Sequence, residues 1–326
     1  MTTYKGIKGF SIQTVAGDPR NLTTGQIWYD SGSQKIQRAK LVAGSWASGG
    51  NMSQALIQRQ GFGLYTAGQV SGGNNSGGNA LGICEQYDGS SWTEVADQNT
   101  NRSYAGGCGT TTAGIIYGGL DHPGAAVNAS EEWDGSSFAE GDNLNAVKYN
   151  MGNTGTQTAS MAVGGIPGAT AQFESYNGTS WTEEDHGLAN ARAGLIGWGI
   201  STSALMAGGD TVNVETYNGT AWTEVGNLNT GKGQGGSSKN TASVGTNGIV
   251  FGGTLTGTPH TATTELFDGT SWTEQGDLPV ASNGLEGFGT GANAVSAGGN
   301  SPPNTYLNTT NEWTGEAAAA SNFTSS

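Results

Sequence analysis

EQYDGSSWTE, residues 85–94, is the stretch of sequence that decides the fold. The same pattern returns as EEWDGSSFAE from Glu131, ESYNGTSWTE from Glu174, ETYNGTAWTE from Glu215 and ELFDGTSWTE from Glu265, with a degenerate copy, NEWTG, from Asn311. An Asp-Gly or Asn-Gly step between two aromatic-bearing runs is the strongest short-range signal for a β-hairpin. We therefore predict a hairpin in each full copy, with a type I′ turn that has positive φ at both central residues.

A second mark, a short apolar run that ends in a glycine pair, precedes each copy. These runs are IIYGG, MAVGG, LMAGG, IVFGG and VSAGG, and the first and least regular one is LYTAGQ. The late aromatics Trp92, Phe138, Trp181, Trp222 and Trp272 are spaced by 46, 43, 41 and 50 residues, and Trp46 lies 46 residues before the first. β-Rich units of this length match four-stranded propeller blades and are too long for helical repeats.

The pattern also predicts the layout of one blade. Strand 1 is a glycine-rich stretch such as ARAGLIGWGI, strand 2 is the apolar run before the glycine pair, strand 3 ends at the first aromatic, and strand 4 carries the second. Glycine suits the innermost strands because it permits close backbone approach. We expect the aromatics, including Tyr87 and Trp92, to pack between blades.

Glycine pairs that close strand 2, an aromatic on strand 3 and a Trp on strand 4 resemble kelch repeats over residues 50–315. The turn and the Trp-Thr-Glu that follows it are more uniform here than in typical kelch proteins. The resemblance implies an all-β fold, a six-bladed kelch-like β-propeller of four-stranded blades. We expect the units near residues 51–94, 95–140, 141–183, 184–224, 225–274 and 275–315.

The sixth unit lacks a clear strand 4, because its tail GEAAAASNFTSS has no Trp. The segment KIQRAKLVAGSW supplies a Trp at the right phase, so we predict that residues 35–46 close the ring as strand 4 of the last blade and remove two exposed sheet edges. This divides the chain into an N-terminal arm, residues 1–34, and a propeller, residues 35–326.

The arm region is basic although the chain carries a net charge of −14. Residues 1–40 hold six of the twelve basic residues and only two acidic ones, Asp18 and Asp30. The arm is therefore predicted to dock to an acidic surface, such as a neighbouring copy, with solvated lysines on a hairpin as the alternative. The candidate docking residues are Lys5, Lys8, Arg20, Trp28 and Tyr29.

The segment GQIWYDSGSQKIQRAKLVAGSW predicts a hairpin with strands at Gln26–Tyr29 and Lys35–Val42. It resembles a short motif of bacteriophage tail-fibre and other virion proteins, with matches at Gly25, Trp28, Tyr29, Asp30, Gly44, Ser45 and Trp46. The final Gly-Ser-Trp is one residue shorter than the usual ending. The resemblance implies a virion protein, assembled in the host cytoplasm.

The sequence offers little for catalysis. Its three histidines fall in different units, and no zinc, calcium, phosphate-loop or nucleophile-elbow motif is present. The glutamates that end the copies, Glu94, Glu140, Glu183, Glu224 and Glu274, are interpreted as solvated strand ends. Cys84 and Cys108 do not form a disulfide framework. We expect no enzyme activity, no metal and no cofactor.

The acidic composition disfavours nucleic acid and anionic lipid as partners. The N-terminus lacks the apolar region of a signal peptide, and no apolar run is long enough to span a membrane.

The loops between strands 2 and 3 are long in units 5, 6, 1 and 2, which are consecutive in a closed ring. A contact face is predicted there, with His122, His260 and Tyr306 as candidate residues, and drift in unconstrained loops is the alternative. The predicted function is a structural and binding protein of a phage particle that mediates assembly and contacts a host surface glycan. The alternatives are a lectin-like or protein-binding module outside a virion and a carbohydrate-active enzyme.

Overall fold

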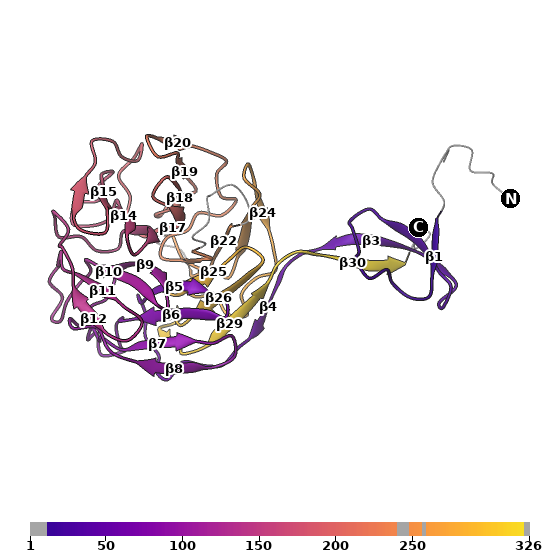
Figure 1. Cartoon of the computed structure of the whole chain (residues 1–326), viewed down its shortest axis with the longest axis horizontal. Helices are drawn as coiled ribbons and strands as arrows, with labels where there is room; N and C mark the ends of the chain where they lie inside the picture. Colours follow the sequence, from indigo (N-terminus) through magenta and orange to yellow (C-terminus); the bar gives the residue numbers. More distant parts are fainter. Residues whose placement is uncertain (1–11, 240–247, 256–258, 323–326) are drawn as a thin grey trace. The chain divides into compact units, whose positions relative to one another are not determined.

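The computed structural model describes residues 12–239, 248–255 and 259–322. This part of the chain is all-β, and it contains no helix that is long and apolar enough to cross a membrane. The chain divides into two compact units (Figure 1). Unit 1 comprises Met1–Gly44 and Gly315–Ser326, and unit 2 comprises Ser45–Thr314.

Unit 2 consists of repeated four-stranded antiparallel sheets. The first contains β5 (Gln60–Leu64), β6 (Ala67–Ser71), β7 (Cys84–Tyr87) and β8 (Trp92–Val95). The second contains β9 (Gly106–Thr110), β10 (Ala113–Tyr117), β11 (Ser130–Trp133) and β12 (Phe138–Glu140). The third contains β13 (Gly152–Thr156), β14 (Ala159–Val163), β15 (Phe173–Tyr176) and β16 (Trp181–Glu183). The predicted strand order within a blade is confirmed in these sheets.

The chain continues with the same strand order. The fourth sheet contains β17 (Leu195–Ile200), β18 (Ser203–Gly208), β19 (Val214–Tyr217) and β20 (Trp222–Glu224). The fifth contains β21 (Gly236–Ser237), β22 (Gly248–Phe251), β23 (Thr264–Phe267) and β24 (Trp272–Glu274). The sixth joins β25 (Glu286–Gly289), β26 (Asn293–Ala297) and β29 (Thr310–Thr314) to β4 (Ser45–Ser48), while β27 (Asn300–Ser301) and β28 (Thr305–Tyr306) form a separate hairpin.

The sixth sheet shows where the prediction for residues 35–46 needs correction. Trp46 lies on the fourth strand of this sheet and pairs with Trp313, as expected. The strand is shorter than predicted, however, because β3 (Lys35–Val42) belongs to unit 1 and pairs there with β30 (Ala317–Asn322). The alanine-rich tail supplies this backbone partner, so the boundary of the N-terminal unit lies after Gly44 and not at residue 34.

The first strands of neighbouring sheets in unit 2 lie against each other, β5 with β9, β9 with β13, β13 with β17, β17 with β21, β21 with β25, and β25 with β5. Aromatic rings on these strands pack onto glycines of the adjacent second strand. A Cβ on Gly248 would lie 2.2 Å from the indole of Trp198, and a Cβ on Gly68 would lie 2.0 Å from the ring of Phe288. Glycine at these positions therefore makes room for the core between sheets.

The tight turn between strands 3 and 4 differs from the predicted type I′ turn. Tyr87 pairs with Trp92, so residues 88–91 form a four-residue loop. Only the glycine has positive φ, 96° at Gly89. The Asp88 carboxylate accepts hydrogen bonds from the backbone N–H groups of Ser90 and Ser91, both at 2.8 Å. The Asp side chain therefore organises the turn, as Asx turns do.

The aspartates of these turns should make the stability of the protein sensitive to acid. Their hydrogen bonds lower the pKa values of Asp88 and Asp134 from 3.8 to about 2, and that of Asp268 in the same direction. A depressed pKa contributes stability that is present above pH 3.8 and is lost as the pH falls through about 2. Replacing the three aspartates by Asn should make the melting temperature less dependent on pH in this window.

Asn177 and Asn218 occupy the same turn position and accept the same backbone hydrogen bonds, so the substitution is compatible with the turn. The measurement is the melting temperature against pH for wild type and triple variant. Parallel curves for the two proteins would contradict this role of the aspartates.

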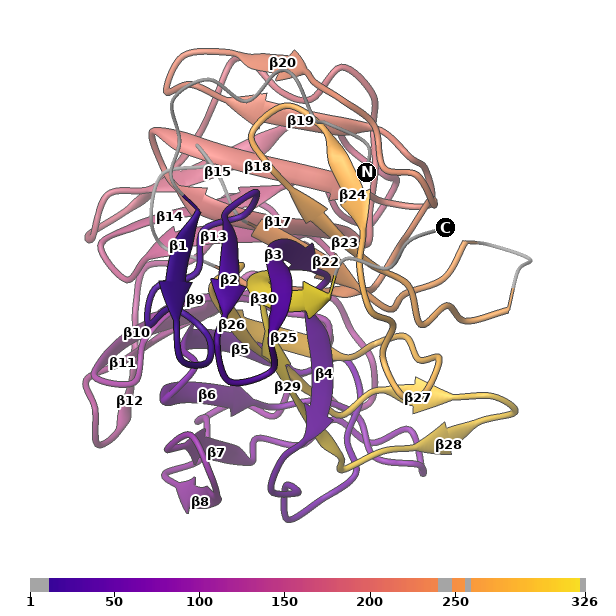
Figure 2. The same cartoon turned by 90° about the vertical axis from the view of Figure 1, so that its right-hand side faces the viewer.

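Unit 1 is a four-stranded sheet in the order β1 (Gln13–Val15), β2 (Ile27–Asp30), β3 and β30 (Figure 2). β2 and β3 pair antiparallel, which confirms the predicted hairpin, and β1 pairs parallel to β2. Asp30 accepts hydrogen bonds from the backbone N–H groups of Gly17 (2.8 Å) and Gly32 (2.9 Å) and from the Ser33 hydroxyl (2.5 Å). Asp30 of the motif therefore fixes the loops at this end of the sheet.

Candidate functional site

Six residues, one before each first strand of unit 2, form a cycle of backbone hydrogen bonds. Each N–H donates to the carbonyl of the corresponding residue in the preceding unit, at 2.7–3.1 Å. The members of this cycle are Gln58, Tyr104, Asn150, Gly194, Gln234 and Gly284. All six have positive φ, between 51° and 67°. Gln58 bonds to Gly284, so the cycle returns to its start.

A cavity of about 70 Å³ opens next to this cycle and is lined by all six of its members. The Lys239 ammonium lies within it, 2.9 Å from a carboxylate oxygen of Glu286 and 3.0 Å from the Asn153 amide oxygen. Burial raises the pKa of Glu286, and the charge of Lys239 acts in the opposite direction. We call this cavity the axial pocket.

The axial pocket also contains polar atoms without protein partners. Gln58 Oε1 and Arg59 Nε are buried and have no hydrogen-bond partner among the residues that the structure describes. Buried polar atoms of this kind are ordinarily satisfied by water or a ligand. The volume suits a few waters or a very small polar molecule and is too small for an extended ligand.

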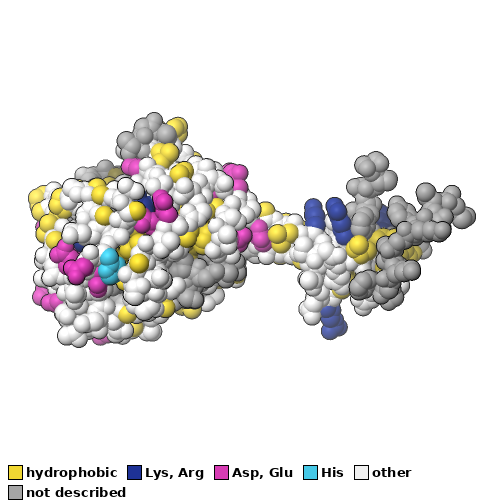
Figure 3. All heavy atoms as spheres, turned by 90° about the horizontal axis from the view of Figure 1, so that it is seen from above, with side chains coloured by type: hydrophobic (Ala, Val, Ile, Leu, Met, Phe, Trp, Pro, Cys, Tyr) yellow, Lys and Arg dark blue, Asp and Glu magenta, His cyan; other side chains and the backbone are white. Residues whose placement is uncertain are grey.

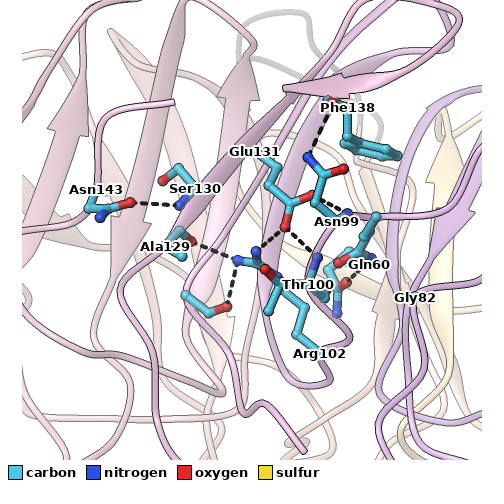
Figure 4. Close-up of polar contacts among 12 residues, drawn as sticks. Gln60, Gly82, Asn99, Thr100, Arg102, Ala129, Ser130, Glu131, Phe138 and Asn143 are labelled. Carbon is cyan, nitrogen blue, oxygen red and sulfur yellow. Dashed lines mark hydrogen bonds and ion pairs between the residues drawn. The ribbon is translucent and has the colours of Figure 1, made fainter. Parts of the chain in front are cut away.

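Buried ion pairs hold the segments that lead into the cycle. In the second sheet Glu131 accepts hydrogen bonds from the backbone N–H groups of Asn99 (2.7 Å) and Thr100 (3.1 Å) and pairs with Arg102 (Figure 4). The Arg102 guanidinium also donates to the Ala129 carbonyl at 2.7 Å. Both charged side chains are at most 1% exposed. The ion pair therefore ties strand 3 to the connection between sheets.

The same pairing recurs in five of the six sheets. The pairs are Arg59–Glu85, Arg102–Glu131, Lys148–Glu174, Arg192–Glu215 and Lys232–Glu265. In the sixth sheet Asn311 takes the place of the glutamate. Sequence reasoning considered only the exposed glutamates at the end of each copy. The signal for the buried ones was the first Glu of each of the five full copies, preceded in its unit by at least one Arg or Lys.

Unit 2 thus keeps all its positive charge inside. Its only basic residues are the five of these pairs and Lys239, so each of the six has a carboxylate partner. Unit 1 holds six basic and three acidic residues, a net charge of +3, which leaves −17 for unit 2. Figure 3 shows Lys and Arg side chains that stand out from unit 1 and acidic side chains over unit 2. The exposed positive charge of the chain is therefore confined to unit 1.

The predicted contact residues lie apart. His122 is exposed beside Pro123, while His260 and Tyr306 are half-buried. Within the described ranges no hydrogen bond or ring contact joins the three. Burial raises the pKa of Tyr104, a member of the backbone cycle, and Tyr306 adds to this shift. None of the three predicted contact residues lines the axial pocket.

The predicted docking residues divide in the same way. Lys5 and Lys8 lie outside the described residues, and Arg20 is exposed. Tyr29 is half-buried, but Trp28 is fully buried. Trp28 therefore packs inside unit 1 and does not contribute to a docking surface. Lys35 and Lys40 on β3 are exposed and place positive charge on the two opposite faces of the sheet.

The chain matches no model of a known protein family and no curated protein. The kelch and phage resemblances therefore rest on the residues quoted for them.

Proposed function

We propose that this protein is a structural and binding component of a bacteriophage particle. In this proposal unit 2 is a closed, six-bladed kelch-like β-propeller, and unit 1 docks it to another virion protein. The backbone cycle through six units and the contacts between successive first strands support the closed propeller. The resemblance of residues 25–46 to phage tail-fibre proteins supports the virion role.

The observation that carries the docking role is the separation of charge. Since every basic side chain of unit 2 is paired internally, unit 1 alone can make attractive contacts to an acidic partner. Unit 1 also carries exposed apolar side chains on the same sheet, among them Ile27 and Ile36. A surface that combines positive charge with exposed apolar residues is typical of a protein contact.

The chain topology adds to this argument. In the other sheets a four-residue turn connects strands 3 and 4. In the sixth sheet strand 3 ends at Thr314 and strand 4 begins at Ser45, and both continue into unit 1. Unit 1 thus replaces that turn. The axial pocket and the long loops belong to the other end of the strands.

Charge reversal on β3 tests the docking role. The variant changes Lys35 and Lys40 together to Glu and so reverses the charge on both faces of the sheet, because the two residues are an odd number of positions apart on β3. A phage that carries this variant in place of the wild-type gene should have about tenfold or more less of this protein in purified particles, because either face would then repel an acidic partner. The measurement is quantitative mass spectrometry of the particles, with urea denaturation to verify that the variant folds.

Reversal of Glu94 and Glu274 to Lys is the matched control, since both are exposed on unit 2, and incorporation should persist. Equal incorporation of the β3 variant would contradict docking through unit 1. Absence of even the wild-type protein from particles would instead favour a free-standing lectin-like module.

A further inference from the structure

The junction between the third and fourth sheets departs from the repeat. The segment after strand 4 donates two backbone hydrogen bonds, one to the start of strand 3 and one to the segment just before it. In other sheets the two donors are three residues apart, as with Val225 and Leu228 or Gln275 and Leu278. In the third sheet the corresponding donors are Glu184 and Leu188, four residues apart. One extra residue is therefore inserted in the segment Glu184–Leu188.

The insertion changes the contacts across this junction. The indole N–H of Trp272 donates to the Gly226 carbonyl of the preceding unit at 2.8 Å, and Trp92 donates to Gly50 in the same way at 2.9 Å.

Trp222 is the equivalent residue here, and its Nε1 is buried without a partner among the described residues. Other indoles donate to a Ser or Thr hydroxyl at the start of strand 3, as Trp181 does to Ser130, but Phe173 occupies that position here. Both usual acceptors of the repeat are therefore missing at this junction.

The tyrosine contacts change as well. Tyr87 and Tyr176 donate their hydroxyls to Glu312 and Glu132 of the preceding sheet, at 2.5 and 2.6 Å. At this junction Ser175 occupies the position of those glutamates.

Tyr217, the equivalent tyrosine, instead lies 3.0 Å from His186 Nε2, and the two rings are stacked. The Ser175 hydroxyl donates to Glu184 at 2.5 Å. The insertion thus brings Glu184 and His186 to the surface of the junction, where both are half-buried.

These residues border a groove of about 630 Å³, within the range of small-molecule sites. Its polar lining is dominated by groups that both donate and accept hydrogen bonds. They include Thr158, Ser175, Asn177, His186, Tyr217 and Thr220. The one ionised group of this lining, Glu184, has no basic partner, because all six basic residues of unit 2 are paired elsewhere.

We infer that this groove binds a neutral saccharide. The hydroxyl groups of a sugar both donate and accept hydrogen bonds, which matches the lining. Vicinal hydroxyls can donate hydrogen bonds to the remaining lone pairs of the Glu184 carboxylate. An anionic sugar would be repelled by Glu184 and by the net charge of unit 2. An ammonium group offers only donors and would leave the donors of the lining unmatched. The inference rests on the proposed binding function, whose glycan class it specifies, but not on docking through unit 1.

Isothermal titration calorimetry of the full-length chain tests the inference. The titrants are glucose, galactose, mannose and N-acetylglucosamine, with glucuronic acid and lysine amide as the anionic and cationic comparisons. At least one neutral sugar should bind. Tyr217→Phe should weaken that binding about 2–10-fold and Glu184→Gln about 10–100-fold, as expected for the loss of one neutral and one charged hydrogen bond.

Tyr87→Phe is the matched control, because it removes the same hydroxyl at a junction without the insertion, and it should leave the affinity unchanged. Deletion of Asp185 restores the spacing of the other sheets and should abolish binding while the chain stays folded. The inference is overturned if no neutral sugar binds, if Tyr87→Phe weakens binding as much as Tyr217→Phe, or if glucuronic acid or lysine amide binds better. Sugar binding and incorporation into particles are measured in separate experiments. A failure of this inference can therefore be distinguished from a failure of the docking proposal.

Discussion

Replacement of Arg102 by Ala is expected to lower the free energy of unfolding by about 3–5 kcal/mol, the range found when one member of a buried ion pair is removed. The substitution leaves the Glu131 carboxylate buried, with only the backbone N–H groups of Asn99 and Thr100 as donors. It also leaves the Ala129 carbonyl without the guanidinium. The measurement is urea denaturation followed by circular dichroism.

The sixth sheet supplies the control for this experiment. There Asn311 stands in place of the glutamate and Ser282 in place of the basic residue, so this sheet lacks the ion pair on strand 3. A double variant with Arg102→Ser and Glu131→Asn removes both charges and should be clearly more stable than Arg102→Ala, because no uncompensated charge remains. A loss below about 1 kcal/mol for Arg102→Ala would show that the pair behaves as an exposed one.

Replacement of Trp46 by Ala should have the second large effect, about 3 kcal/mol or more, as for other truncations of packed aromatic side chains. Trp46 contacts the rings of Phe251 and Trp313 at centroid distances of 4.8 and 5.3 Å, and its Nε1 donates to Thr264 Oγ1 at 2.9 Å. It is the principal apolar anchor of β4. Its loss should also expose the edge of β29 and promote association of chains, measured by light scattering.

Trp46→Phe separates packing from hydrogen bonding. It keeps an aromatic ring on β4 but removes the bond to Thr264 and part of the ring system, so it should cost about 1–2 kcal/mol, less than Trp46→Ala. Equal stability of Trp46→Ala and Trp46→Phe would contradict the packing role.

Much of unit 2 could be predicted because its signals are local. The Asp-Gly steps, the glycine pairs and the spaced aromatics indicate strand type and order within a single unit, and the structure confirms that order. The bounds of β3 match the predicted hairpin strand, but its place in unit 1 could not be predicted in this way, because that depends on pairing with β30, at the opposite end of the chain. The turn type was wrong because the Asp88 side chain supplies an acceptor that a type I′ turn does not require.

The candidate sites were harder to predict. Trp28 matches the motif but is fully buried, so it does not contribute to docking. A motif match alone does not show whether a side chain is buried. The backbone cycle involves Gln58, Asn150 and Gly284, which share no residue type and only a common φ. The insertion at Glu184–Leu188 is one residue in a repeat whose length already varies, so it becomes visible only when hydrogen bonds fix the register.

The internal placement of every basic residue of unit 2 has a practical consequence for handling the protein. Trypsin cleaves after Lys and Arg, yet in unit 2 these side chains are at most 10% exposed and are held by carboxylates. Digestion of the native chain should therefore cut at Arg20, Lys35 and Lys40 and leave residues 41–326 as one resistant fragment, since no Lys or Arg follows Lys239. Amine-reactive dyes and coupling reagents should likewise modify unit 1 and spare the groove and the axial pocket, so the protein can be labelled or immobilised without blocking its binding surfaces.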